Sequence, residues 1–312
     1  MLTVIKYIDR HIQITDHLED ETNNPLWIDA TNMTKAEASL LQEKFGLHPL
    51  TVEDVLHTRT RIKVEQFNNY LFCVFYALKK DHGIRPVEID FVISRNFIIT
   101  SHLGGVQFIK DILENKEKLE KSFSKGMDFL FHHILDQEID TFFPVLEKLD
   151  WNIEQVEDMI TQRASPEVLK RIMELKREIV DIKRFTLPQR EKVSLLTKNE
   201  YEQISRRALP YFRDIYDHSV RVYETLENYR ESVSTTYDLY MSTMSNNMNE
   251  IMKVLSIIAT IALPLTVLSG IFGTNFTVLP GASSRYGFWI MILMMGGIVG
   301  AMMIYFRRRG WF

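Results

Sequence analysis

The pattern of apolar positions divides the N-terminal part of the chain into short strand-like runs and one helix-like stretch. The runs are LTVIKYI (2–8), LWIDA (26–30), YLFCVFYAL (70–78) and EIDFVISRNFIITSH (88–102), and the helix-like stretch is TKAEASLLQEKFG (34–46). Strands that alternate with helical segments are typical of α/β architectures. We therefore predict an α/β domain with a mixed sheet over residues 1–108.

Helical periodicity replaces the strand pattern beyond Gly105. In SPEVLKRIMELKREIVDI, Ser165 stands at a capping position and Pro166 at the first helical position. Apolar residues then recur at steps of four and three, at Val168, Ile172, Leu175, Ile179 and Ile182. This spacing predicts coiled-coil-like helices over residues 109–208.

Polar residues in the same region raise the question of a metal site. They are His132, His133, Asp136, Glu138 and Asp140. A metal site and a solvated helix face with a few ion pairs both fit these residue types. We favour the solvated face and assign no chemistry there.

Two long apolar runs lie near the C-terminus. They cover residues 254–272 and 286–306, and Arg285 is the only charged side chain from Val254 to Phe306. A bilayer core of about 30 Å needs roughly 20 apolar residues in a helix. A pair of buried helices in a soluble domain is the alternative, but uncharged runs of this length with basic flanks favour two membrane spans joined by an outer loop at 273–285.

The flanks of the two runs predict their orientation. Lys253 precedes the first run, and Arg307, Arg308 and Arg309 follow the second, which places both ends on the cytoplasmic side by the positive-inside rule. The N-terminus has no apolar stretch typical of a signal peptide. We expect a multi-pass protein of the cell membrane with both termini in the cytoplasm and a basic tail at 307–312.

A single long helix is predicted from about Tyr211 to Phe272, where only Pro264 interrupts the pattern. At 1.5 Å per residue it would be roughly 90 Å long, so residues 209–253 are expected to form a stalk that continues into the first span. Mostly small and polar residues recur on it at alternating steps of four and three. They are Asp238, Ser242, Ser245, Asn249, Met252, Ser256, Ala259, Leu263, Thr266, Gly270 and Gly273.

This set of residues, which forms a stripe along the predicted helix, suggests a pore. A 3.5-residue period keeps one face of each helix turned toward a common axis in a bundle. The stripe would then line a narrow path with hydroxyls and amides, with apolar constrictions at Met252 and Leu263. The alternative is that the small residues only allow close packing of membrane helices. We prefer close packing for Gly296 and Gly300 in the second run.

Charge and motifs narrow the function further. The chain has 37 Lys+Arg and 41 Asp+Glu, a formal net charge of -4, which gives no indication of a nucleic-acid partner. The sequence contains no G-x-x-x-x-G-K-[ST] stretch for an ATP-driven pump, and no G-x-S-x-G or H-E-x-x-H stretch for a hydrolase. We therefore expect a protein that is not an enzyme and has no organic cofactor.

The stretch YDLYMSTMSNNMNEIMKVLSIIATIALPLTVLSGIFGTNF (237–276), followed by a second span and RRRGWF, resembles the CorA-type divalent metal ion transporters. The resemblance extends to LPYFRDIYDH (209–218) and to LHPLTVEDVLHTRTRIKVE (47–65), which is similar to a cytosolic stretch of the family, with Ile62 where proline is usual. It covers essentially the whole chain. It implies a homopentamer with an α/β/α cytosolic funnel and the first span lining the pore.

The resemblance also implies roles for individual residues. Asn275 falls on the asparagine of the G-M-N signature at the outer mouth, here Gly273-Thr274-Asn275. Thr266, Leu263, Met252 and Asn249 fall on pore-facing positions, and Asp238 falls on an acidic ring at the inner end. Asp214 is similar to a carboxylate that holds a regulatory metal ion together with a neighbouring subunit. Its partner does not align, and Asp81 is our candidate.

The implied cargo is hydrated Mg²⁺, with Co²⁺ or Ni²⁺ as further candidates, and Mg²⁺ is also the implied regulatory ion. Two departures bear on selectivity: Thr274 replaces the usual methionine, and the acidic outer loop of the family reads Leu279-Pro280-Gly281-Ala282 here. Two alternatives therefore stay open. One is a proton-coupled zinc transporter of the same family, and the other is a membrane-anchored metal sensor without flux.

Overall fold

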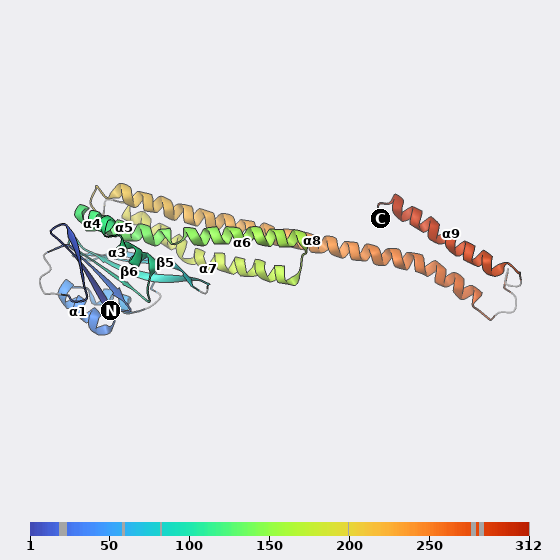
Figure 1. Cartoon of the computed structure of the whole chain (residues 1–312), viewed down its shortest axis with the longest axis horizontal. Coiled ribbons are helices and arrows are strands. Elements are labelled where there is room, and N and C mark those ends of the chain that lie inside the picture. The colour runs from blue at the N-terminus through green and yellow to red at the C-terminus, as the bar shows by residue number, and fades with distance from the viewer. Residues whose placement is uncertain are drawn as a thin grey trace. The chain divides into compact units, whose positions relative to one another are not determined.

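The computed structural model describes residues 1–18, 24–57, 60–81, 83–198, 200–275, 279–280 and 284–311. It consists of two compact units, Met1–Tyr237 and Asp238–Phe312. One helix, α8 (Leu209–Phe272), belongs to both units because it runs continuously from the first into the second (Figure 1). The predicted unbroken helix is thus confirmed, and Pro264 lies inside it.

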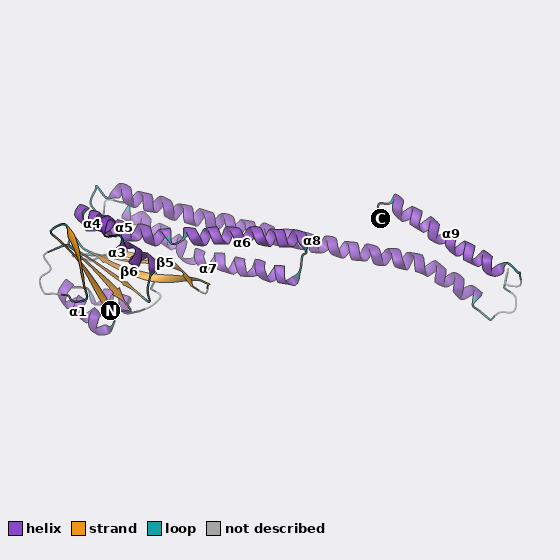
Figure 2. Ribbon diagram, viewed as in Figure 1, coloured by secondary structure: helices purple, strands orange, loops and turns teal. Residues whose placement is uncertain are grey.

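A seven-stranded sheet forms the base of the first unit (Figure 2). Its strands are β1 (Leu2–Ile8), β2 (His11–Thr15), β3 (Leu26–Thr31), β4 (Lys63–Gln66), β5 (Leu71–Asp81), β6 (Gly83–Ile93) and β7 (Phe97–His102). The strand order is β2-β1-β3-β7-β6-β5-β4, and β3 and β7 pair in parallel while the other pairs are antiparallel. The predicted mixed sheet is confirmed, although the run from Glu88 to His102 contains a turn and contributes to two strands.

Both faces of the sheet are apolar because rows of aligned residues cross it. One row joins Val4, Ile28, Ile99, Val92 and Phe72, and it is covered by α1 (Lys35–Phe45) and α2 (Pro49–Leu56). The row one residue along each strand points to the other face, where it packs under α3 (Gln107–Glu114), α4 (Lys116–Lys125) and α5 (Met127–Asp140). A sheet buried on both faces accounts for the nearly continuous apolar strands in the sequence.

Three long helices extend from this core. They are α6 (Phe143–Gln162), α7 (Pro166–Leu196) and the first part of α8 (Figure 1). The predicted apolar positions of α7, from Val168 to Ile182, are all buried. Ser165 and Pro166 stand at the predicted start of α7, but the Ser165 side chain makes no capping hydrogen bond. Hydrogen bonding between Thr236 and Glu157 (2.8 Å) and an ion pair between Lys183 and Glu227 join α8 to α6 and α7.

The second unit contains the rest of α8 and α9 (Gly287–Arg308). Each helix contains an 18-residue stretch of high mean hydropathy, 2.2 in α8 and 2.1 in α9, and neither stretch is buried. Both helices are long enough to cross a membrane. Large apolar side chains such as Leu263, Trp289 and Leu293 are exposed on them. Water is a poor solvent for such surfaces, so these helices are suited to lipid or to packing against further helices.

Candidate ion-conduction site

The mostly small and polar residues that recur from Asp238 to Gly273, called the α8 stripe below, occupy an exposed face of the helix. From Asp238 to Gly270 its members are exposed, except Ser256, which is half-buried. Less exposed positions recur on another face, at Lys253, Ile257, Ile261, Pro264, Leu268 and Phe272. Because successive residues turn by about 100°, Leu263 lies about 200° around the helix from Ile261. The stripe is therefore on the side that the chain's own packing leaves uncovered.

The Thr266 hydroxyl donates its proton to the Ala262 carbonyl at 2.9 Å. The oxygen keeps its lone pairs, so on the exposed side of the helix it can only accept. The two predicted constrictions, Met252 and Leu263, expose 53% and 66% of their surface. Neither side chain is buried in the core of the chain, so both are accessible for contacts outside it.

The signature Gly273-Thr274-Asn275 directly follows the end of α8 at Phe272. The Gly273 N–H donates to the Ser269 carbonyl at 2.9 Å, and the Thr274 hydroxyl donates to the Ile271 carbonyl at 2.8 Å. A Cβ on residue 273 would lie 2.9 Å from that same Ser269 oxygen, so any other residue would force this close turn to shift. Thr274 therefore acts as a cap on the helix end, and the Asn275 side chain is left exposed.

Part of the outer loop is outside the description. Residues 276–278 and 281–283 are not among the described residues, so Gly281 and Ala282 of the predicted loop cannot be placed, while Leu279 and Pro280 are described. Asp81 ends β5 and its backbone is paired with Gly83, but its side chain also lies outside the description. Asp238 is exposed on α8.

Asp214 lies near a group of potential metal ligands in the first unit. Asp136 and Asp140 on α5 and His218 on α8 each offer a ligand atom, and these atoms lie within 4.8 Å of one another. The His218 Nδ1 is 3.7 Å from the Asp136 Oδ1. Burial raises the pKa of Asp136 above its usual value; the nearby His218 opposes this shift and the negative charge of Asp214 adds to it.

Two carboxylates and an imidazole within this distance can hold a divalent cation. Oxygen ligands suit Mg²⁺, whereas the imidazole of His218 suits Co²⁺ or Zn²⁺ better. The spacing of these residues in the sequence is a signal for this group. Asp136 and Asp140 are four residues apart on α5, and Asp214 and His218 are four residues apart on α8, so each pair shares one helix face.

The prediction of a solvated face on α5 is wrong. Glu138 is fully buried, with its Oε1 accepting from the Gln189 Nε2 at 2.9 Å, and His133 is 5% exposed. Burial lowers the pKa of His132 and of His133 to about 4, so both rings are neutral at pH 7. Helix α5 packs on the sheet and between other helices, so most of its surface is buried. Asp136 and Asp140 lie on the part of α5 that is only half-buried.

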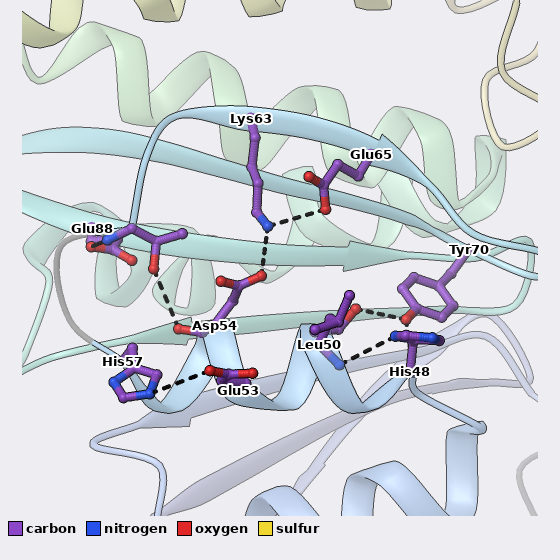
Figure 3. Close-up of polar contacts among 11 residues, drawn as sticks. His48, Leu50, Glu53, Asp54, His57, Lys63, Glu65, Tyr70 and Glu88 are labelled. Atoms are coloured by element: carbon purple, nitrogen blue, oxygen red, sulfur yellow. Dashed lines mark hydrogen bonds and ion pairs between the residues drawn. The ribbon is translucent and has the colours of Figure 1, made fainter.

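Residues between Leu47 and Glu65 form a network of hydrogen bonds and ion pairs around α2 (Figure 3). The His48 Nδ1 accepts from the Leu50 N–H at 3.2 Å and caps α2, and the Tyr70 hydroxyl receives the His48 N–H at 2.9 Å. Lys63 on β4 donates to Asp54 on α2 and to Glu65. Burial favours the neutral amine of Lys63, but these two hydrogen bonds outweigh it and raise the pKa above its usual value. The network holds α2 against the edge strand.

A family model described as CorA-like Mg²⁺ transporter protein matches residues 22–308, nearly all of the 312 residues. The chain belongs to the CorA-like Mg²⁺ transporter family. A cobalt/magnesium transport protein CorA from Thermotoga maritima is 34% identical over 299 residues, which cover 93% of this chain and 84% of that protein. The chain is thus a divalent-cation transporter of the CorA family and a membrane protein, and its relatives are transporters rather than enzymes.

Solved structures agree with this fold. The CorA magnesium transporter from Methanocaldococcus jannaschii superposes with a TM-score of 0.87 at 23% identity and covers 100% of this chain and 99% of its own. The cytoplasmic domain of ZntB from Vibrio parahaemolyticus superposes with a TM-score of 0.68 at 13% identity, over 78% of this chain and 98% of its own. At these identities the comparisons show only a shared CorA-like fold. The shared fold does not indicate which ion the chain transports.

Proposed function

We propose that this protein is a homopentameric channel that carries hydrated Mg²⁺ down its electrochemical gradient into the cytoplasm. The observation that carries the proposal is the position of the α8 stripe, which lies on the uncovered face of the helix and leads to the exposed Asn275. Five copies of this face around an axis would form the pathway, and five Asn275 amides would form its outer mouth. The family to which the chain belongs is named for Mg²⁺ transport, which supports Mg²⁺ as the cargo.

The chemistry of the stripe suits a hydrated cation. Mg²⁺ prefers octahedral oxygen coordination and sheds its water reluctantly. Neutral acceptors such as the Asn275 amide and the Thr266 hydroxyl can accept from the water hydrogens without binding the ion tightly. An inside-negative potential of 100 mV then contributes about 4.6 kcal/mol for a divalent ion, which is more than a thousandfold in concentration ratio.

Flux into proteoliposomes tests this directly. The purified protein should take up Mg²⁺ when the interior is made negative, and Asn275→Ala should abolish most of this uptake. Asn247→Ala is the matched control, because Asn247 is an exposed asparagine of α8 that lies about 200° around the helix from Ser245 of the stripe. Loss of flux in the control as well would contradict a specific role of the mouth.

Gating by cytosolic Mg²⁺ rests on the acidic group around Asp136. Carboxylates that are close together repel one another, and a bound divalent cation would relieve this repulsion. We infer that Asp214 and a carboxylate of the neighbouring subunit hold such an ion in the closed channel, with Asp136, Asp140 and His218 beside it. If Asp214→Asn left inhibition by internal Mg²⁺ unchanged, Asp214 would not be the sensor.

The same liposomes separate the two alternatives. A proton-coupled zinc carrier would show Zn²⁺ flux that follows an imposed pH gradient, and a sensor would show no flux of either ion. The exposed amide of Asn275 and the absence of a carboxylate in the stripe beyond Asp238 give no site for a transported proton. We therefore favour the potential-driven channel.

A further inference from the structure

The basic end of α9 has a defined structure. The Trp311 N–H donates to the Phe306 carbonyl at 3.0 Å and the Gly310 N–H donates to the Arg307 carbonyl at 3.2 Å, which are the two hydrogen bonds of a Schellman motif. Gly310 has the left-handed φ of +69° that this motif requires. The Trp311 ring stacks on the buried Phe306 ring with 5.4 Å between centroids, the apolar contact that accompanies such an end.

This end also contacts the start of the first span. The Lys253 Nζ donates to the Gly310 carbonyl at 3.4 Å. Lys253 therefore meets the partial negative charge, about half an elementary charge, that a helix carries at its C-terminus. The three arginines that precede Gly310 are not needed for this purpose. All three are exposed, and no carboxylate of the described residues lies within 4.0 Å of their nitrogens.

The position of these charges along the chain is also informative. The apolar runs end at Phe306 and begin at Val254, so the cluster of Lys253 and the three arginines lies where the apolar surface stops. Tyr305 and Trp311 are exposed beside it, with the Arg309 guanidinium 5.8 Å from the Tyr305 ring centroid. Aromatic side chains with basic neighbours are typical of the level of lipid headgroups.

We propose that Arg307, Arg308 and Arg309, held by the Gly310 turn and flanked by Lys253, form a binding site for the phosphate of an anionic phospholipid. Arginine presents several N–H donors that match phosphate oxygens. The turn fixes the backbone, so binding orders only side chains. This site is separate from the ion pathway and its occupancy does not depend on transport.

The test uses the full-length protein in an uncharged detergent, titrated with short-chain phosphatidylglycerol or phosphatidylcholine and followed by native mass spectrometry. A variant with Arg307→Gln, Arg308→Gln and Arg309→Gln should bind phosphatidylglycerol about a hundredfold more weakly, since each basic residue contributes about 1 kcal/mol near an anionic surface. Binding of phosphatidylcholine should not change.

The matched control removes three charges elsewhere, with Lys110→Gln, Lys116→Gln and Lys121→Gln on the exposed sides of α3 and α4. It should bind phosphatidylglycerol like the parent protein. Equal weakening in both variants would overturn the proposal, because net charge alone would then account for binding. Displacement of the lipid by millimolar inorganic phosphate would also overturn it, because the site would then be a general anion site.

Gly310 provides a second variant if the triple change prevents folding. Gly310→Val cannot adopt the left-handed conformation without strain, whereas Gly310→Asn can. The valine variant should lose several-fold in affinity for phosphatidylglycerol and the asparagine variant should retain it. Equal affinity in the two variants would show that the turn does not organise the site. None of these measurements involves flux, so they remain valid if the channel proposal fails.

Discussion

Replacing Gly273 by alanine tests the reasoning about the outer mouth most sharply. The added Cβ would meet the Ser269 carbonyl oxygen at 2.9 Å, which is closer than real Cβ atoms come to another heavy atom. The contact is with backbone, so it cannot be relieved by rotating a side chain. The last turn of α8 must shift, and the hydrogen bond from the Gly273 N–H to the same oxygen is strained or lost.

We expect Gly273→Ala to lower the free energy of unfolding by about 1 to 3 kcal/mol, the range for adding a methyl group to a well-packed site. Loss of the hydrogen bond would account for about 1 kcal/mol of this. Because Thr274 and Asn275 follow directly, the shift moves the amide that we place at the mouth. Gly273→Ala should therefore lower the midpoint of thermal unfolding and reduce potential-driven Mg²⁺ uptake in proteoliposomes at least tenfold.

Gly297→Ala is the control for this experiment. A Cβ at Gly297 meets nothing within 4 Å, and alanine is favoured over glycine inside a helix by about 1 kcal/mol. It should leave the midpoint unchanged or raise it. If Gly273→Ala kept both the midpoint and the uptake of the parent protein, the close turn would not control the mouth.

Three further predictions concern single side chains. Thr274→Ser should retain the hydrogen bond to the Ile271 carbonyl and the ion selectivity of the parent protein. Thr274→Val loses this hydrogen bond and should lower the midpoint of thermal unfolding. A changed Mg²⁺/Co²⁺ flux ratio in the serine variant would show instead that Thr274 contacts the ion. Burial raises the pKa of Glu138 well above its usual value, so the folded state favours the protonated carboxyl and the protein loses stability as pH rises. Glutamine resembles the protonated form. In thermal unfolding, Glu138→Gln should therefore match the parent near pH 4 and be more stable than the parent at pH 9. Because burial also raises the pKa of Asp136, protection of the first unit by Co²⁺ in limited proteolysis should weaken as pH falls below neutral, and Asp136→Asn should lack this protection at all pH values.

The sequence was most informative where burial is periodic. The strands β5 to β7 carry apolar residues on both faces, and α7 repeats them at steps of four and three, so both were predictable. Short edge strands were not, because HIQIT in β2 is mostly exposed and β4 has only four residues. Helix α2 begins at Pro49 with His48 as its cap, and histidine is not among the usual capping residues.

The group of potential metal ligands in the first unit could not be assembled from the sequence, because it depends on packing between distant segments; only the spacing of four residues within each helix was visible. Asp136 and His218 come together only when α5 packs against α8, and neither helix face indicates the other. The polar residues of α5 suggested solvent, whereas Glu138 packs next to Gln189 from α7 in the interior. A helix covered on several sides buries polar residues in pairs, and sequence periodicity does not reveal which pairs form.

The placement of charge along α8 limits how the proposed channel can work. At 4 Å and an effective dielectric constant of 20, one carboxylate attracts a divalent cation by about 8 kcal/mol. A site with this carboxylate would therefore bind the ion about a millionfold more tightly than the same site without it. Beyond Asp238 the α8 stripe contains no carboxylate, only hydroxyls, amides, small residues and the apolar Met252 and Leu263. A hydrated ion on this path would meet weak acceptors and two apolar constrictions, so its passage would be limited by pore width rather than by release from a tight site. The carboxylates Asp136, Asp140 and Asp214 are in the first unit, where tight binding is compatible with a regulatory role and would not slow conduction.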